Sequence, residues 1–128
     1  SSSNDFTEAM YYRLSQAVIF SNSFIKNASE LSGDEVNVFI AEARFLRAYA
    51  YYNLLDLYGN VPLTTEISTD LPTQSNRTEL FNFIESELME IESILLASNE
   101  YGRVDNVAAH ALLSRLYLNA EAWTGRSS

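Results

Sequence analysis

Cysteine is absent from these 128 residues, and histidine occurs only once, as His110. The absence of cysteine excludes a disulfide framework, a thiolate metal site and a cysteine nucleophile. A single histidine on a helix is far more often structural or solvent-facing than catalytic or metal-binding. The sequence therefore assigns no catalytic residue, no metal and no cofactor.

Proline and glycine are also few, at two and four residues, while apolar residues make up 47% of the chain. A chain of this length and composition is expected to fold and to bury about two-thirds of the surface that it exposes when unfolded. No apolar run approaches the ~18–20 residues of a membrane-spanning helix, so no transmembrane segment is predicted. No signal peptide opens the chain.

Positive charge is scarce, with 8 Lys and Arg against 17 Asp and Glu and a formal net charge of −9. Nucleic acid binds to basic surfaces, and anionic lipid attracts the same positive charge. The composition therefore excludes nucleic acid as a partner and disfavours direct electrostatic docking onto a membrane.

Apolar residues recur at helical spacing in four segments, residues 6–28, 34–58, 77–97 and 106–123. The segment between the second and third helices, residues 60–77, is polar and contains two prolines and four threonines, which predicts an extended loop. The third helix carries a single apolar face, which consists of Phe81, Ile84, Leu88, Ile91 and Leu95.

The second helix carries apolar residues on two opposite sides. One stripe consists of Phe39, Ala43, Leu46, Ala50, Leu54 and Leu57. The other stripe consists of Ala41, Phe45, Ala48, Tyr52 and Leu55. A helix on the outside of a globule shows one stripe, so two stripes predict a helix that packs between neighbours, as in stacked helical pairs. The predicted fold class is all-α.

The fourth helix repeats this two-sided pattern. One side carries Ala109, Leu112, Leu116, Ala120 and Trp123, and the other carries Val107, Ala111 and Leu118. We therefore expect this helix to be sandwiched as well. If its second neighbour lies outside this chain, an apolar surface stays exposed along Val107, Ala111 and Leu118, or along the first helix.

The run from Glu42 to Leu63, EARFLRAYAYYNLLDLYGNVPL, closely resembles the signature of the SusD/RagB family. The resemblance continues in residues 77–88 and 99–125. Nine of the matching residues are interpreted as a structural signature: Glu42, Arg44, Phe45, Arg47, Tyr52, Leu57, Tyr58, Gly59 and Pro62.

The resemblance implies irregular tetratricopeptide-like helical repeats in an alpha-alpha superhelix. It also implies a surface-exposed outer-membrane lipoprotein that binds a starch-like oligosaccharide and passes it to a SusC-like TonB-dependent transporter. Such proteins take part in polysaccharide utilisation and nutrient uptake and are not enzymes. Family members run to several hundred residues, with a signal peptide and a lipidated cysteine. Residues 1–128 are therefore expected to be an N-terminal helical fragment that supplies scaffold and transporter-facing surface.

Several polar residues were weighed as functional candidates. Arg44 and Arg47 are expected to pair with carboxylates of the next helix rather than with a partner protein. Four glutamates of the third helix could supply a hydrolytic acid pair, but a solvated acidic face is the favoured interpretation; they are Glu85, Glu87, Glu90 and Glu92.

The aromatic residues give no firm glycan contact. Sugar recognition uses aromatic faces together with amides and carboxylates, but helical spacing places most of these rings in the core. Tyr49 and Tyr51 lie between the two stripes of the second helix, so of these rings they are predicted to be the least firmly placed in the core. Two alternatives remain open at this point: a free-standing helical-repeat module that binds a peptide, and a glycan-active enzyme that uses Glu85 and Glu92.

Overall fold

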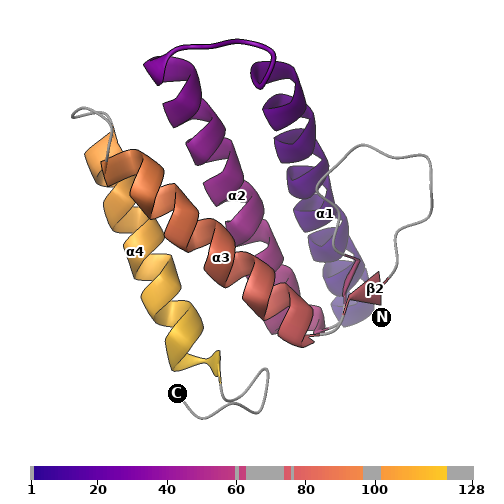
Figure 1. The fold of residues 1–128 in the computed structure, drawn as a ribbon. Helices are drawn as coiled ribbons and strands as arrows, with labels where there is room; N and C mark the ends of the chain where they lie inside the picture. Colours follow the sequence, from indigo (N-terminus) through magenta and orange to yellow (C-terminus); the bar gives the residue numbers. More distant parts are fainter. Residues whose placement is uncertain (1, 60, 63–73, 76, 97–101, 121–128) are drawn as a thin grey trace.

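A computed structural model describes residues 2–59, 61–62, 74–75, 77–96 and 102–120. Four α-helices and one short strand pair make up these residues (Figure 1). Their bounds are α1 Ser2–Ala28, α2 Asp34–Tyr58, β1 Val61–Pro62, β2 Gln74–Ser75, α3 Arg77–Leu96 and α4 Gly102–Leu118. The all-α prediction is confirmed.

The helix boundaries agree closely with the periodicity of the sequence. The bounds of α2 are those predicted. The first helix begins earlier, at Ser2, and Asp5 in its first turn interacts favourably with the positive end of the helix dipole. The fourth helix also begins earlier, at Gly102, and Trp123 lies outside the described residues.

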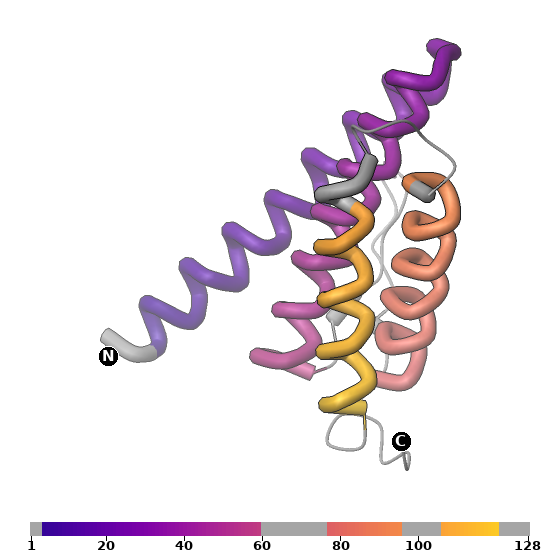
Figure 2. Tube along the Cα trace, turned by 90° about the vertical axis from the view of Figure 1, so that its left-hand side faces the viewer, coloured from indigo at the N-terminus to yellow at the C-terminus, as the bar shows by residue number. Residues whose placement is uncertain are grey.

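Helix α2 packs between α1 and α3, which lie on opposite sides of it (Figure 2). Its second stripe is buried at Ala41, Ala48 and Leu55, and Phe45 packs against the core from a half-buried position. The first stripe is buried only at Ala43, Ala50 and Leu54. The prediction of a helix between two neighbours is confirmed.

The prediction that neighbouring helices cover the whole first stripe was wrong. Phe39, Leu46 and Leu57 are more than half exposed. At 100° per residue, these three lie about 20–80° away from Ala43, Ala50 and Leu54 around the helix. Helix α1 therefore covers the alanine edge of the stripe and leaves its outer edge uncovered.

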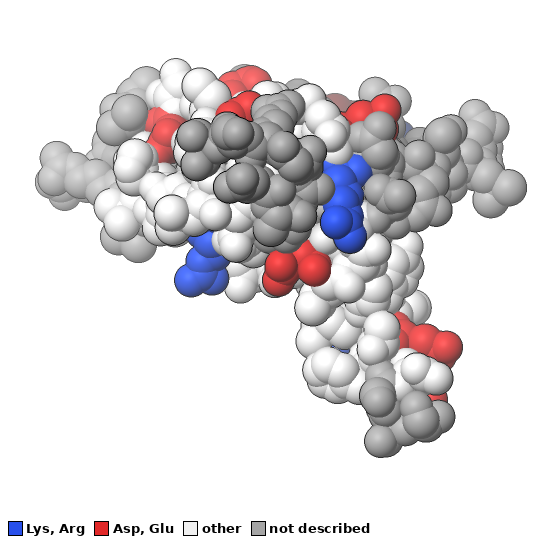
Figure 3. Space-filling view, turned by 90° about the horizontal axis from the view of Figure 1, so that it is seen from below, with Lys and Arg blue, Asp and Glu red and all other residues white. Residues whose placement is uncertain are grey.

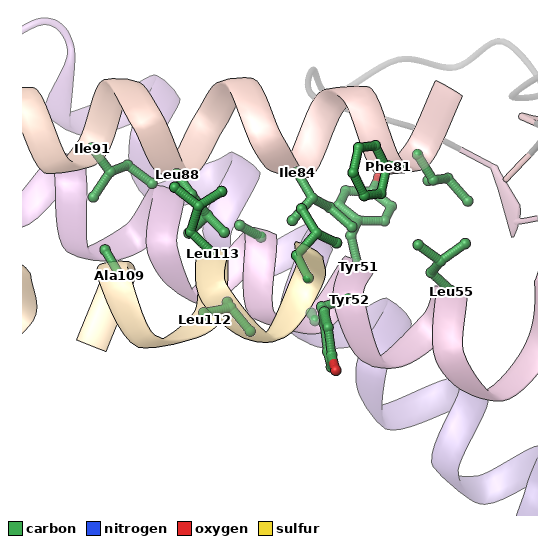
Figure 4. Packing of buried hydrophobic residues seen from close by; sticks show 14 of the residues in the cluster. Tyr51, Tyr52, Leu55, Phe81, Ile84, Leu88, Ile91, Ala109, Leu112 and Leu113 are labelled. Carbon is green, nitrogen blue, oxygen red and sulfur yellow. The ribbon is translucent and has the colours of Figure 1, made fainter. Parts of the chain in front are cut away.

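The core lies where α3 packs against α2 and α4. All five residues of the predicted apolar face of α3 are buried, including Ile84, Leu88 and Ile91 (Figure 4). Tyr51 lies among them at 1% exposure, with its ring 5.6 Å from the ring of Phe83 in an edge-to-face arrangement. Tyr51 was therefore wrongly predicted to stand at the margin of the core.

The described residues cover only one side of helix α4. Ala109, Leu112 and Leu116 are buried against α2 and α3. On the opposite side, Val107 and Leu118 are 67% and 84% exposed, and Ala111 is exposed as well. The described part of the chain thus supplies no second neighbour for α4. The prediction that this helix is sandwiched is not met, whereas the expected exposed apolar surface is confirmed.

The end of α2 depends on Gly59, which is buried. Its φ is +80°, which side-chain-bearing residues rarely adopt, and its N–H donates to the carbonyl of Leu55 at 3.1 Å. A Cβ at this position would lie 2.8 Å from Nε of Arg77 at the start of α3. Beyond Gly59, Val61 pairs antiparallel with Ser75. This strand pair within the predicted loop was not foreseen.

Candidate functional site

The most polar interior feature of the described residues is an ion-pair cluster between α2 and α3. Arg44 and Arg47 stand one turn apart on α2, and both reach Glu87 of α3. The Nε of Arg44 lies 3.1 Å from Oε1 of Glu87, and Nη2 of Arg47 lies 2.7 Å from the same oxygen. Nη2 of Arg44 donates to the other carboxylate oxygen. The predicted pairing of the two arginines with the next helix is confirmed.

Three further groups complete the arginine environment. Arg47 donates from Nη1 to Oδ1 of Asn22 on α1 at 3.0 Å, so the cluster joins three helices. Its guanidinium also lies 5.5 Å from the ring centre of Phe83, a cation–π distance. Arg44 donates to the more exposed Glu90 at 3.2 Å. The Nε of Arg47 is buried without a hydrogen-bond acceptor.

The charges shift one another's protonation equilibria. Burial alone would raise the pKa of Glu87, but hydrogen bonds from Arg44 and Arg47 and their positive charges lower that pKa below its ordinary value. The hydrogen bond to Glu87 raises the pKa of Arg44 above its usual range, against an opposing effect of burial. Glu87 and Arg44 therefore stay charged near neutral pH.

The prediction of a solvated acidic face on α3 was wrong at Glu87. This residue is only 8% exposed, because it lies on the arc of α3 that faces Arg44 and Arg47. Glu90 is solvated, with its side chain 63% exposed, although it pairs with Arg44. With its carboxylate enclosed by two guanidiniums, Glu87 joins helices and offers no open oxygen to a ligand.

Acid should weaken this cluster. Because the pKa of Glu87 is lower in the folded chain than the unfolded value of about 4.3, its contribution to stability is fully present above that value and is lost as the pH falls through the folded pKa. We expect the free energy of unfolding to fall less steeply below about pH 4.5 in Glu87→Gln than in the unmodified chain. Urea unfolding at several pH values measures this slope, with Glu90→Gln as the matched control. Equal slopes for Glu87→Gln and the unmodified chain would contradict the assignment.

The other candidate carboxylates lie on the α4 side of α3. Nδ1 of His110 lies 2.7 Å from Oε1 of Glu92, and the His110 side chain is 72% exposed, so of the expected structural or solvent-facing roles the structure shows the solvent-facing one. Glu85 hydrogen-bonds Tyr117, whose pKa is raised by burial and by that carboxylate. Glu85 and Glu92 thus each interact with a residue of α4.

Two tyrosines of the signature run connect α2 to its neighbours. The hydroxyl of Tyr58 donates to the carbonyl of Thr7 on α1 at 2.6 Å, and its ring meets Tyr11 edge to face at 5.1 Å. Tyr52 is buried beside α4, and Nδ2 of Asn119 lies 3.5 Å from its hydroxyl. Burial, and then the nearby Asp56, raise the pKa of Tyr52.

The remaining signature residues differ in exposure. Phe45 is half-buried and stacks on the exposed Tyr49, with ring centres 6.4 Å apart. Glu42 is half-buried, and Leu57 is 56% exposed. Pro62 lies in β1. The signature residues therefore form several contacts along α2 rather than one concave site.

The described residues show neither a membrane-crossing helix nor a metal cluster. Within the ranges given above, no helix combines the length and hydrophobicity needed to cross a bilayer. The same residues bring no three histidine, aspartate or glutamate side chains together in a group that could hold a metal ion.

Comparison with known proteins shows which proteins this chain is similar to in sequence. Residues 2–118 match the SusD-like family described as starch-binding and associating with the outer membrane. The starch-binding protein SusD of Bacteroides thetaiotaomicron is 38% identical over 129 residues, which cover 99% of this chain and 23% of that protein. A SusD-like protein of Bacteroides ovatus is 35% identical over 88 residues, or 66% of this chain and 16% of that protein.

Solved structures show the same helical arrangement. A laminarin-binding SusD-like protein superposes with a TM-score of 0.77 at 26% identity, over 89% of this chain and 27% of that one. A structure solved with a xylogluco-oligosaccharide gives a TM-score of 0.76 at 26% identity, over 88% of this chain and 24% of that one. This chain thus spans about a quarter of the length of these similar proteins or less.

Proposed function

Since this chain belongs to the SusD-like family of starch- and glycan-binding proteins, we propose that the protein containing it captures a glucan oligosaccharide for uptake. The capture would take place at the bacterial surface, on an outer-membrane lipoprotein that works with a SusC-like TonB-dependent transporter. The observation that carries the proposal is the 38% identity to a starch-binding protein over 99% of this chain. Two structural relatives are named for laminarin and a xylogluco-oligosaccharide, which supports proposing a glucan of open linkage as the ligand.

Within that function, this segment serves as a scaffold and as a surface that faces the transporter. The ion-pair cluster of Arg44, Arg47 and Glu87 fixes α1, α2 and α3 relative to one another, which supports a rigid platform. The proposal includes no bond-breaking step, because the carboxylates considered for one are engaged elsewhere: Glu87 with two arginines and Glu92 with His110.

We also propose that residues 1–128 are the N-terminal helical part of a longer protein. The uncovered side of α4, with Val107, Ala111 and Leu118, has the apolar spacing of a helix–helix contact. The next helical pair of a repeat array would cover such a face, as each repeat contacts its neighbours. The fraction of the relatives' length that this chain spans agrees with this arrangement.

Calorimetry on the complete product of the encoding gene tests glycan capture. We expect maltoheptaose, laminarin oligosaccharide or xylogluco-oligosaccharide to bind with a dissociation constant between about 1 μM and 1 mM. The 128-residue chain alone should give no binding heat, because glycan contacts in this proposal lie outside its helices. A mannan oligosaccharide is the matched control ligand. The proposal fails if the complete product binds none of the three glucans, or if it releases reducing sugar from one of them.

A further inference from the structure

A seven-residue period runs through the buried side of α3. Leu80, Glu87 and Ile94 follow one another at this spacing, and each lies within about 20° of the next around the helix. Leu80 is buried, Glu87 is 8% exposed, and Ile94 packs against the core from a half-buried position. Glu87 therefore interrupts a row that is otherwise aliphatic.

The other buried residues of α3 repeat at the same interval. Phe81, Leu88 and Leu95 lie seven residues apart, as do Ile84 and Ile91, and all five are buried. If α3 moved by seven residues along α2, most of these positions would again be filled by a large apolar side chain. Apolar contacts alone thus distinguish poorly between the two registers.

Helix α2 also offers an apolar site at this interval. The two helices pack antiparallel, with Glu87 beside Arg47. A shift of α3 by seven residues toward the start of α2 would bring Glu87 level with Ile40 and Leu80 level with Arg47. Because α2 has 25 residues and α3 has 20, the shifted helix would still lie along α2 for most of its length.

The connection between the two helices does not fix this register by its length. Residues 59–76 join α2 to α3, whereas only residues 29–33 join α1 to α2. A seven-residue shift is a movement of about 10 Å along the helix axis. A connection of the length of residues 59–76 can span several times that distance. Helix α4 packs mainly on α3 and can move with it.

The buried charges do distinguish the two registers. In the observed register, Arg44 and Arg47 both donate to Glu87. In the shifted register, the guanidiniums would meet Leu80 and the carboxylate would meet Ile40, so charges would be buried without partners. Surface charges make no such distinction, because water solvates them in either register. Seen from below, acidic and basic side chains are scattered among uncharged ones (Figure 3).

We infer that the cluster of Arg44, Arg47 and Glu87 selects the register in which α3 packs on α2 and excludes a packing shifted by seven residues. Replacing a buried ion-pair cluster by apolar residues is often neutral or stabilising, and single buried polar residues set the register of coiled coils. The cluster thus distinguishes two apolar packings of similar stability. The inference is independent of glycan capture.

Moving the carboxylate by seven residues tests this inference on the 128-residue chain. The variant Leu80→Glu/Glu87→Leu keeps composition and net charge, and it should fold with α3 shifted toward the start of α2, where the moved carboxylate meets both arginines. Spin labels at Leu57→Cys and Met89→Cys, two positions more than half exposed, report the shift, and no native cysteine interferes. Their separation in double electron–electron resonance should increase by roughly 7–10 Å.

An apolar variant tests the inference without supplying a new partner. Arg44→Met/Arg47→Leu/Glu87→Leu fills the interrupted row and removes all three buried charges. It should stay helical, with a urea midpoint no lower than that of the unmodified chain. The same spin-label pair should then show two separations, the original one and one roughly 7–10 Å longer.

The control carries the same three substitutions at exposed positions, as Arg13→Met, Arg115→Leu and Glu35→Leu. It should show only the separation found in the unmodified chain. A single unchanged separation in either test variant would overturn the inference, since side-chain shape or the strand pair of residues 61–62 and 74–75 would then set the register. Unfolding of either test variant would also overturn it, because no second apolar packing would be available. Calorimetry tests glycan capture separately.

Discussion

Replacing Glu87 with alanine is expected to lower the free energy of unfolding by about 3–5 kcal/mol, the usual cost of removing one partner from a buried ion pair. The substitution leaves Arg44 and Arg47 facing each other one turn apart on α2, with 14% and 7% of their side chains exposed and no common anion. In a domain of this size the melting temperature should fall by about 10–20 °C. Thermal and urea unfolding, followed by circular dichroism, measure the change.

Glu90→Ala is the matched control, because it removes a carboxylate from the same cluster on the same helix. Its side chain is 63% exposed and contacts only Arg44 within the cluster, so we expect a loss below about 1 kcal/mol. Similar losses for Glu87→Ala and Glu90→Ala would show that burial does not distinguish the two carboxylates. The cluster would then be a surface network without a role in fixing the helices.

Tyr51→Ala is expected to cost about 3–5 kcal/mol, because it empties the largest fully buried side-chain volume of the described core. The ring of Tyr51 lies between α2 and α3, near Phe81 and Ile84, and packs edge to face on Phe83 (Figure 4). Because Phe83 also faces the Arg47 guanidinium, the cavity would loosen the ion-pair cluster as well. Urea unfolding measures the loss, and near-ultraviolet circular dichroism reports the packing of the remaining aromatic rings.

Tyr49→Ala provides the comparison from two positions away on the same helix. Tyr49 is 50% exposed and contacts the half-buried Phe45, so its removal should cost less than about 1 kcal/mol. Tyr51→Phe keeps the ring and removes only the hydroxyl, which separates cavity formation from hydrogen bonding. If Tyr51→Ala cost no more than Tyr49→Ala, the core would not lie where the structure places it.

Both predictions bear on whether the segment is a rigid scaffold. A rigid scaffold built from these helices must hold α1 and α3 on opposite sides of α2. The Glu87 cluster and the Tyr51 packing both join α2 to α3 in the described residues. Their loss should therefore loosen the packing of α2 against α3.

Local sequence determined the helices themselves and the pairing of their charges. The apolar period and the Gly-Asn-Val-Pro stop predicted the bounds of α2, because helix propensity, φ at glycine and the missing N–H of proline all act within a few residues. Two arginines between apolar stripes predicted carboxylate partners on the next helix, since a charge brought near the interior requires an opposite charge. The family signature added the fold and the glycan-binding class.

Tertiary structure decided which members of similar sets are buried. Tyr49 and Tyr51 look equally marginal on a helical wheel, because a wheel gives angles around one axis and not where the neighbouring helices cross. The crossing of α3 over α2 buries Tyr51 and Glu87 and leaves Tyr49 exposed. The position of α1 likewise leaves Phe39, Leu46 and Leu57 open, although their period matches that of the buried alanines beside them. Whether a side chain is buried depends on how two helices pack against each other, and the sequence pattern of one helix does not give that packing.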